Sequence, residues 1–203
     1  MISQMEFVRR VDVQTETIER YVREGKLVPD LVVPMSEHRT FKYFKEESLE
    51  RYAKENGWTL IDDSNRKDMF MDMIRQMDMS YSYKPVLIKA VLLYADDKGR
   101  IKLDDIVSYF RSYYEGRQNA GYIVEKKNSI FAKGGYTNKE AERNILSNPF
   151  KRFEDMQMLK HTKMLGIIQV DESVWKKLTD AEKTEIEKIC DEKLAEYYDR
   201  LSK

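Results

Sequence analysis

The segment from Asp12 to Trp58 contains an ordered series of structural signals that few folds can satisfy. Apolar residues recur at helical spacing from Ile18 to Val22, and Gly25 follows where a left-handed residue ends a helix. Pro29 then prevents that helix from resuming. Two short β-prone runs and another helical pattern come next. The order predicts a small helical domain that carries a two-stranded β-hairpin.

The expected elements of this domain follow from the same signals. Thr15 or Thr17 can cap a helix that extends to Glu24. Residues 31–33 and 39–44 form the two strands, with a turn over 34–38. Glu46 opens the next helix, whose apolar positions are Leu49, Tyr52 and Ala53. Only residues 2–10 are left for a first helix, which is therefore short.

A short motif and the residues that follow it resemble a known family. The motif is Arg23-Glu24-Gly25-Lys26-Leu27-Val28-Pro29, and it is followed by Arg39, Tyr43-Phe44 and Glu46-Glu47-Ser48-Leu49. This order resembles the DNA-binding domain of the MerR and phage-excisionase families and covers roughly a quarter of the chain. The resemblance implies a winged helix-turn-helix over residues 1–58 that binds double-stranded DNA.

That resemblance also implies which side chains contact DNA. The helix from Thr15 to Glu24 would enter the major groove, and the hairpin would reach the adjacent backbone or minor groove. Glu19 and Glu24 dilute the positive charge, and the spacing of Tyr21 with Ile18 favours a core position for Tyr21. The candidate contacts are Gln14, Thr15, Thr17, Glu19, Arg20, Arg23, Lys26, Arg39 and Lys42.

Composition narrows the class of protein. The 203 residues carry 36 basic and 36 acidic side chains, which argues against strong nonspecific DNA affinity. The charges are unevenly placed, with 14 basic and 8 acidic residues over 84–152 but 7 basic and 10 acidic over 171–203. Cys190 is the one cysteine, so no disulfide framework is expected. We expect a cytoplasmic protein without a signal peptide or a membrane span.

Residues 59–80 form a connecting segment rich in aspartate and methionine. Met69, Met73 and Met77 make a stripe at helical spacing. Such a stripe is usually deformable core packing, and an adaptable groove for a partner is the alternative. The aspartates fit no calcium loop, because the glycine and the terminal glutamate are missing.

Residues 81–178 predict a second domain of similar order. The expected elements are a helix from Pro85, a turn over Asp96–Gly99, a strand over Arg100–Leu103, a helix capped by Asp104, a helix over Asn138–Ser147 that restarts at Asn148-Pro149 and runs to Met156, and a hairpin of Leu159–His161 with Gly166–Val170. Helix, strand, helix, helix and hairpin is the winged-helix order. The fold class is therefore mainly α with small β-hairpin wings: two winged-helix-like units in tandem plus a C-terminal helix over residues 179–203.

The second domain offers weaker binding candidates. Its polar helical surface carries Lys139, Arg143, Asn144, Lys151 and Arg152 as candidate DNA contacts, although a solvated face is the commoner reading of such charges. Ser80–Pro85, Phe110-Arg111 and Asn148–Phe153 are similar to an accessory domain of bacterial helicases and nucleases in restriction or phage-defence systems. That resemblance implies a helicase or nuclease partner.

The last predicted helix runs from Thr179 to Leu201. Thr179 or Asp180 can cap it, and one side is lined by Ile186, Ile189, Cys190, Leu194, Tyr197 and Leu201. This side either docks onto its own domain or pairs two copies in a homodimer, as DNA readers often do.

Catalytic signals are sparse. His38 and His161 lack metal-ligand spacing, Gly134-Gly135 is too short for a phosphate loop, and no serine lies in an elbow motif. We therefore expect no enzyme activity, cofactor or metal. The leading hypothesis is a sequence-specific DNA-binding transcription regulator of bacterial or phage type. The alternatives are a non-catalytic accessory subunit of a phage-defence or mobile-element complex and a pure protein-interaction module.

Overall fold

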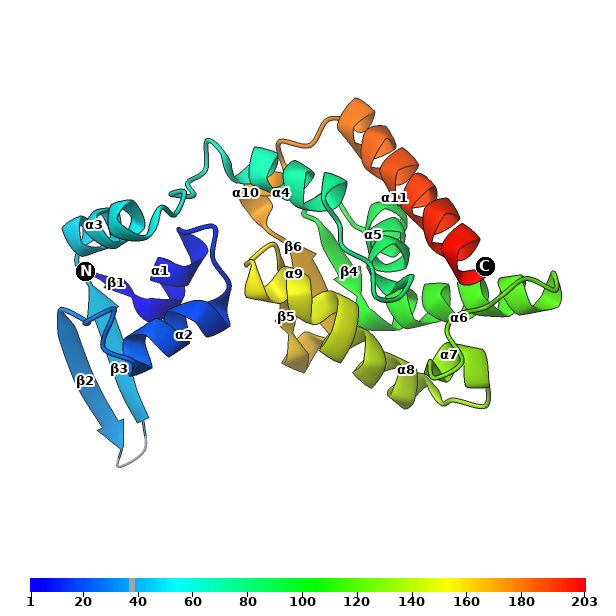
Figure 1. Cartoon of the computed structure of the whole chain (residues 1–203), viewed down its shortest axis with the longest axis horizontal. Coiled ribbons are helices and arrows are strands. Elements are labelled where there is room, and N and C mark those ends of the chain that lie inside the picture. The colour runs from blue at the N-terminus through cyan, green and yellow to red at the C-terminus, as the bar shows by residue number, and fades with distance from the viewer. Residues whose placement is uncertain (37–38) are drawn as a thin grey trace. The chain divides into compact units, whose positions relative to one another are not determined.

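The computed structural model describes residues 1–36 and 39–203, which form two compact units (Figure 1). Unit 1 comprises Met1–Arg66 with Asp155–Gln157, and unit 2 comprises Lys67–Glu154 with Met158–Lys203. The first division falls after Arg66, later in the chain than the expected domain end at Trp58. The fold is mainly helical, as predicted, and its small amount of β structure forms two three-stranded antiparallel sheets.

Unit 1 contains the predicted helix, hairpin and helix, together with a short strand that the sequence did not reveal. Its elements are β1 (Ile2–Ser3), α1 (Gln4–Arg9), α2 (Thr15–Arg23), β2 (Leu31–Ser36), β3 (Arg39–Phe44) and α3 (Glu46–Asn56). The sheet has the order β1-β3-β2, with Ile2 opposite Phe44. The first helix is short because Ser3 caps it by accepting from the Glu6 amide at 3.1 Å, leaving Ile2 for the sheet.

One apolar core holds these elements together. It consists of Phe7, Val8, Val11, Ile18, Leu27, Phe44, Leu49 and Tyr52. Ile18 is the buried residue of α2, while Phe7 and Phe44 rings pack 4.7 Å apart between their centroids. Because Ile18 fixes α2 to this core, the opposite side of α2 faces solvent.

The ends of α2 agree only partly with the prediction. Gln14, not Thr15 or Thr17, is the N-cap residue, and its side chain makes no capping bond. Both threonines instead lie inside the first turn. Gly25 has a φ of 73°, and this left-handed residue lets the Lys26 amide donate to the Tyr21 carbonyl at 2.8 Å. The prediction that Gly25 ends this helix is confirmed.

The hairpin of unit 1 is longer on its first strand than predicted. β2 continues through Pro34 to Ser36, so the expected turn over 34–38 is wrong at its start. Pro34 is tolerated because β2 is an edge strand, where a missing N–H costs no ladder bond. The rest of that turn, including His38, lies outside the described residues.

Unit 2 is larger and contains the remaining elements. They are α4 (Arg66–Arg75, with Arg66 in unit 1), α5 (Tyr83–Tyr94), β4 (Arg100–Lys102), α6 (Leu103–Asn119), α7 (Ile130–Lys133), α8 (Asn138–Ile145), the π-helix η1 (Leu146–Phe150), α9 (Lys151–Asp155, with Asp155 in unit 1), β5 (Leu159–Thr162), the 3-10 turn η2 (Lys163–Leu165), β6 (Ile167–Val170), α10 (Glu172–Trp175) and α11 (Asp180–Leu201). Its sheet has the order β4-β6-β5, so in each unit the last strand lies between the other two.

Two helix starts in unit 2 differ from the expectation for reasons of tertiary contact. α5 begins at Tyr83, which places Pro85 inside the first turn, where its missing N–H is harmless. α6 begins at Leu103, so Asp104 is not its cap. The Leu103 amide donates to the carbonyl of Gly166 at 2.8 Å, and this bond to the distant hairpin starts the helix early.

The predicted break at Asn148-Pro149 is a π-helical turn within a continuous helical run. Pro149 lies inside η1, between α8 and α9. Proline lacks the N–H that a regular helix needs, and a wider turn accommodates this loss. The Asn144 carbonyl accepts from the Asn148 amide side chain at 3.0 Å and from the Ser147 hydroxyl at 3.3 Å. Helix therefore persists where a restart was expected.

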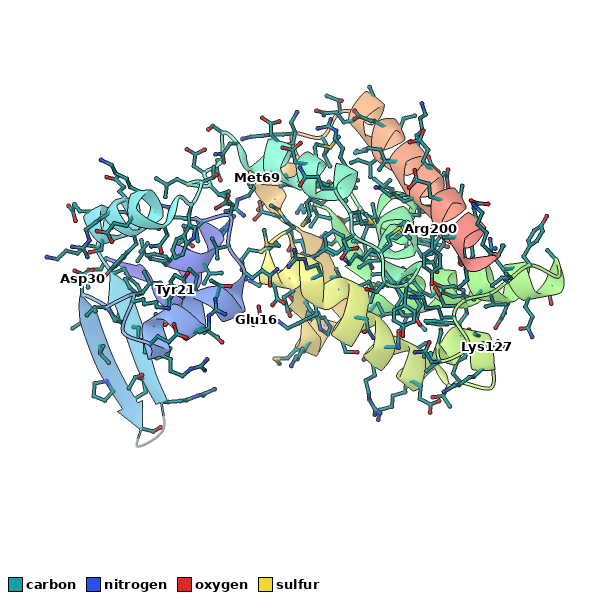
Figure 2. All side chains as sticks on the ribbon, viewed as in Figure 1. Glu16, Tyr21, Asp30, Met69, Lys127 and Arg200 are labelled. Carbon is teal, nitrogen blue, oxygen red and sulfur yellow. The ribbon has the colours of Figure 1, made fainter. Side chains whose placement is uncertain are left out.

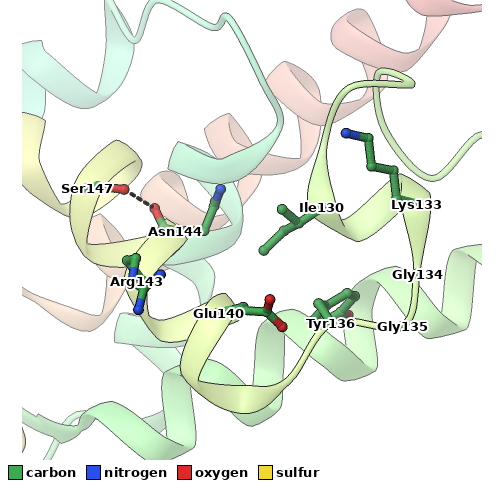
Figure 3. Close-up of a pocket in the computed structure, with 9 residues that line it drawn as sticks. All are labelled: Ile130, Lys133, Gly134, Gly135, Tyr136, Glu140, Arg143, Asn144 and Ser147. Carbon is green, nitrogen blue, oxygen red and sulfur yellow. Dashed lines mark hydrogen bonds between the residues drawn. The ribbon is translucent and has the colours of Figure 1, made fainter.

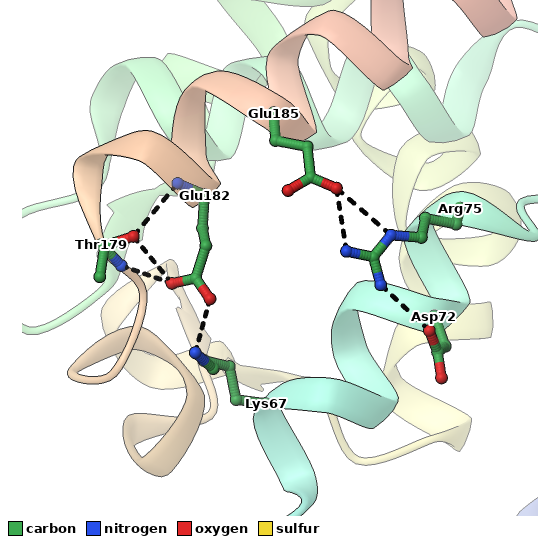
Figure 4. A network of polar contacts seen from close by, with 6 residues as sticks. All are labelled: Lys67, Asp72, Arg75, Thr179, Glu182 and Glu185. Atoms are coloured by element: carbon green, nitrogen blue, oxygen red, sulfur yellow. Dashed lines mark hydrogen bonds and ion pairs between the residues drawn. The ribbon is translucent and has the colours of Figure 1, made fainter.

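The methionine-rich helix packs mainly through other residues than the predicted stripe. Between residues 67 and 80 the buried residues are Phe70, Met71, Ile74 and Met77, whereas Met69 and Met73 are only half-buried. Two ion pairs attach α4 to α11: Lys67 with Glu182 at 2.5 Å and Arg75 with Glu185 at 2.9 Å (Figure 4). α4 thus packs as part of unit 2.

The C-terminal helix agrees closely with its prediction. Thr179 caps α11 in a capping box with Glu182, and the helix ends at Leu201. Ile186, Cys190, Leu194 and Tyr197 are buried, and α11 packs against α5 of the same unit. The apolar side that we considered for a homodimer is therefore covered within the chain. Among the described residues, no helix combines the length and apolarity that crossing a membrane requires.

Candidate nucleic-acid interface

The solvent-facing side of α2 carries four charged residues of both signs. Arg20 and Arg23 are exposed, and so are Glu16 and Glu19. Gln14 is exposed at the start of the helix, while Thr17 is half-buried. Glu16 and Tyr21 lie on this same helix (Figure 2). The surface has little net charge, so it suits specific contacts better than general attraction to a polyanion.

Thr15 occupies a different environment from the arginines. Its hydroxyl donates to the carbonyl of Asp155 at 3.2 Å, and Asp155 clusters with unit 1. The residue is half-buried. An engaged hydroxyl is a weaker candidate for DNA contact than the exposed arginine side chains on the same helix.

Tyr21 supports the helix instead of facing solvent, as its spacing predicted. It is half-buried, and its ring lies 5.7 Å from that of Trp58. The Lys26 ammonium and the Arg20 guanidinium lie 5.1 Å and 5.6 Å from the Tyr21 centroid. These contacts hold two candidate cations beside α2. Lys26 also pairs with Glu24 at 2.7 Å, and its hydrogen bond lowers the pKa of that carboxyl group.

The hairpin of unit 1 contributes two cations and an apolar surface. Arg39 is exposed and Lys42 is half-buried on β3. Leu31, Val32 and Met35 on β2 and Phe41 on β3 are also exposed, although they are apolar. Contacts to DNA phosphates need only the cations of the hairpin. The exposed apolar side chains form a second surface, which suits contact with a protein.

In unit 2, the structure brings together some of the predicted residues and separates others. Lys139 and Arg143 on α8 line one hollow of about 450 Å³ together with Phe150, His161 and Lys163, and we name this the hairpin hollow. Glu142 and Glu154 also line it. Lys151 and Arg152 lie on α9 outside its lining, and Lys151 is 4.0 Å from Glu154. Arg152 is near Lys84, whose pKa is lowered first by burial and further by that cation.

A second hollow of about 410 Å³ also borders α8, and we name it the loop hollow. Figure 3 shows Glu140, Arg143 and Asn144 on one wall, with the segment from Ile130 to Tyr136 forming the other. Arg143 and Ser147 line both hollows. Glu140 lies in the capping box with Thr137, and its carboxylate lines this hollow together with the cations Lys133 and Arg143.

Two buried polar atoms at these hollows have no hydrogen-bond partner in the described part of the chain: Asn144 Oδ1 and His161 Nε2. Asn144 lines the loop hollow and His161 the hairpin hollow. Buried polar groups are normally satisfied, so these atoms mark places where a ligand or a water molecule can bind. The spacing of residues in the sequence did not single out Lys133, His161 or Lys163 as members of a site. These residues come to lie beside α8 only when the chain folds.

The described residues of the two units do not form a metal centre. Within residues 1–36 and 39–203, no group of three histidine, cysteine, aspartate or glutamate side chains could hold a metal ion. Cys190 is buried, and burial raises the pKa of its thiol to about 12. Comparison with family models, with curated proteins and with solved structures found no match.

Proposed function

We propose that this chain is a sequence-reading DNA-binding protein without enzyme activity, most simply a bacterial or phage transcription regulator. The observation that carries the proposal is the placement of Arg20 and Arg23 on the exposed side of α2, opposite Ile18 in the core. A helix held in this way can enter a major groove, where arginine forms bidentate bonds to guanine. The neighbouring hairpin carries Arg39, which suits a phosphate contact.

The element order of each unit supports the same proposal. In unit 1, α2 precedes a hairpin and α3, as in the winged helix-turn-helix that the residues around Gly25 resemble. In unit 2, α5, β4, α6, the short α7, the helical run from α8 to α9 and the β5–β6 hairpin follow one another, and apart from α7 this is the order expected of a winged helix. Lys139 and Arg143 lie on α8, at the start of the helical run that leads to the hairpin.

The test is selection of binding sites from a random duplex library by the purified chain over a series of salt concentrations. Wild-type protein should enrich a motif. Arg20→Ala/Arg23→Ala/Arg39→Ala should lose that enrichment. The control Arg51→Ala/Lys54→Ala/Lys188→Ala removes the same charge from other exposed helix surfaces and should retain it. Enrichment that persists in the first variant would contradict the proposal.

One observation favours a second candidate, a non-catalytic accessory subunit that binds a protein partner such as a helicase or nuclease. The exposed apolar side chains of Leu31, Val32, Met35 and Phe41 give the unit 1 hairpin a surface suited to protein contact. Under this proposal, Val32→Ser/Phe41→Ser should abolish copurification of the partner, whereas the triple arginine variant should retain it. Retention of the partner by the serine variant would contradict this candidate.

A further inference from the structure

The turn of the β5–β6 hairpin exposes two adjacent apolar side chains. Met164 is 98% exposed and Leu165 is 69% exposed. Both lie in η2, and Gly166, with a φ of 59°, completes the turn. Hairpin turns normally carry polar residues, and these two side chains contribute nothing to the core of unit 2. Their exposure is explained if they contact an apolar surface of another molecule.

The hairpin that carries this apolar turn also lines the hairpin hollow, where Lys139, Arg143 and Lys163 lie with Glu142 and Glu154. Lys163 directly precedes Met164, and Lys139 and Arg143 line the hairpin hollow from α8. His161 Nε2, which has no hydrogen-bond partner among the described residues, is buried at the same hollow. Arg143 also reaches the loop hollow, where Lys133 lies. Glu140, Glu142 and Glu154 lie among these cations, so the two hollows together carry a small excess of positive charge.

A nucleic acid has the complementary arrangement, since anionic phosphates flank the apolar faces of stacked bases. Proteins use lysine and arginine to hold the backbone and insert or stack apolar side chains against bases. A side chain that enters a continuous duplex must unstack two base pairs. At the end or branch point of a duplex, the outermost base pair already presents an open face, so an apolar contact there costs less.

We propose that unit 2 binds the end or branch point of a nucleic-acid duplex. Lys139, Arg143 and Lys163 hold the phosphate backbone, while Met164 and Leu165 pack against the outermost base pair and weaken its stacking. This inference deepens the proposed function and rests on DNA binding by the chain. It assigns to unit 2 a recognition of DNA structure that differs from sequence reading by α2.

The experiment uses the full chain and two DNA probes of the same duplex sequence, one continuous and one ending in two unpaired arms. Fluorescence anisotropy gives the Kd for each, and 2-aminopurine at the last base pair reports unstacking. Wild-type protein should bind the branched probe at least about fivefold more tightly, which corresponds to one stacked base, and should raise 2-aminopurine fluorescence.

Three variants separate the parts of the site. Met164→Ala/Leu165→Ala should lose the branched-probe preference and the fluorescence rise while it keeps binding to the continuous duplex. Lys139→Ala/Arg143→Ala/Lys163→Ala should weaken binding to both probes. The control Leu93→Ala removes an apolar side chain that is 63% exposed on α5 and should behave as wild type. Thermal unfolding of each variant confirms that the fold is intact.

Equal wild-type affinity for the two probes would overturn the inference. So would a Met164→Ala/Leu165→Ala variant that keeps the preference, because the apolar turn would then be irrelevant to DNA and would fit a protein partner instead. The Arg20→Ala/Arg23→Ala/Arg39→Ala variant distinguishes the two proposals. A failure of sequence selection with the branched-probe preference intact would contradict only the role of α2.

Discussion

At the scale of single residues, one buried carboxylate in unit 2 collects several hydrogen bonds. Glu125 accepts hydrogen bonds from the Ser82 amide at 2.8 Å, from the Ser82 hydroxyl at 2.5 Å and from the Tyr197 hydroxyl. The Tyr198 hydroxyl donates to the Ser82 hydroxyl at 3.1 Å. Burial raises the pKa of both tyrosines, so these donors stay protonated. Glu125 thereby joins the start of α5 to the end of α11.

Removing this acceptor should destabilise unit 2. Glu125→Ala leaves the Ser82 and Tyr197 donors buried without a partner, and each unsatisfied donor costs about 1–3 kcal/mol. We expect the free energy of unfolding to fall by roughly 3 kcal/mol in urea denaturation. Glu125→Gln keeps one acceptor oxygen and should lose less. The surface control Glu192→Ala should change stability by under about 0.5 kcal/mol, and an equally small effect of Glu125→Ala would refute the argument.

Two glycines should respond oppositely to alanine. Gly99 has a φ of 71°, and a Cβ there would lie 2.7 Å from Trp175 Cγ. Gly99→Ala should therefore destabilise the protein by about 1–3 kcal/mol. Gly116 lies within α6, and a Cβ there would meet nothing within 4 Å. Gly116→Ala should stabilise by about 0.4–1 kcal/mol because alanine restricts the unfolded chain. Urea midpoints that shift in the same direction would contradict this pair of expectations.

At the scale of elements, the contact between α4 and α11 depends on Glu182. One of its oxygens accepts from Lys67 Nζ, and the other accepts from the Thr179 amide at 2.8 Å and the Thr179 hydroxyl at 3.0 Å (Figure 4). The hydrogen bond from Lys67 is the largest cause that lowers the Glu182 pKa, from 4.5 to about 2. One carboxylate therefore both caps α11 and attaches the methionine-rich helix to it.

This lowered pKa makes the contact sensitive to acid. The folded-state pKa lies below the unfolded value, so the stabilisation is complete above about pH 4.5 and is lost as pH falls toward 2. Glu182→Gln should be less stable than wild type at pH 7, and the difference should shrink at pH 3. Urea unfolding at both pH values measures it. The same stability difference at both pH values would show that ionisation of Glu182 does not contribute to the contact. Glu192→Gln, on the exposed side of α11, serves as the control.

At the scale of the whole molecule, charge balance sets how DNA binding responds to salt. The chain has no net charge, and its basic excess lies in residues 84–152 of unit 2. On α2 of unit 1, Arg20 and Arg23 lie beside Glu16 and Glu19. We therefore expect few phosphate contacts from unit 1 and a larger share from unit 2, so that neither unit alone accounts for the salt dependence.

The salt dependence can be measured directly. The slope of log K against log salt changes by about 0.9 for each phosphate contact that is lost. Lys139→Ala/Arg143→Ala/Lys163→Ala should reduce its magnitude by roughly 2–3, and Arg51→Ala/Lys54→Ala/Lys188→Ala should leave it unchanged. Equal slopes for the two variants would mean that the binding surface of unit 2 lies elsewhere.

Local signals in the sequence were enough to locate several elements. The α2 helix ends at Arg23, just before Gly25, the strand over Arg39–Phe44 has the predicted bounds, and α11 begins after Thr179. Each signal depends on residues within one or two turns: a positive φ that glycine tolerates, a β-prone run, or a threonine followed by a glutamate. The exposure of Arg20 and Arg23 followed in the same way from the apolar spacing around Ile18.

Contacts between distant residues were decided by the tertiary structure alone. Ile2 joins a sheet because it meets Phe44, α6 starts early because Leu103 bonds to Gly166, and Glu125 is buried because Ser82 and Tyr197 surround it. His161 and Lys163 likewise line the hairpin hollow only because the β5–β6 hairpin packs beside α8. Periodicity in a sequence reports which side of an element is apolar. It does not report which other element covers that side, because this depends on how the whole chain packs.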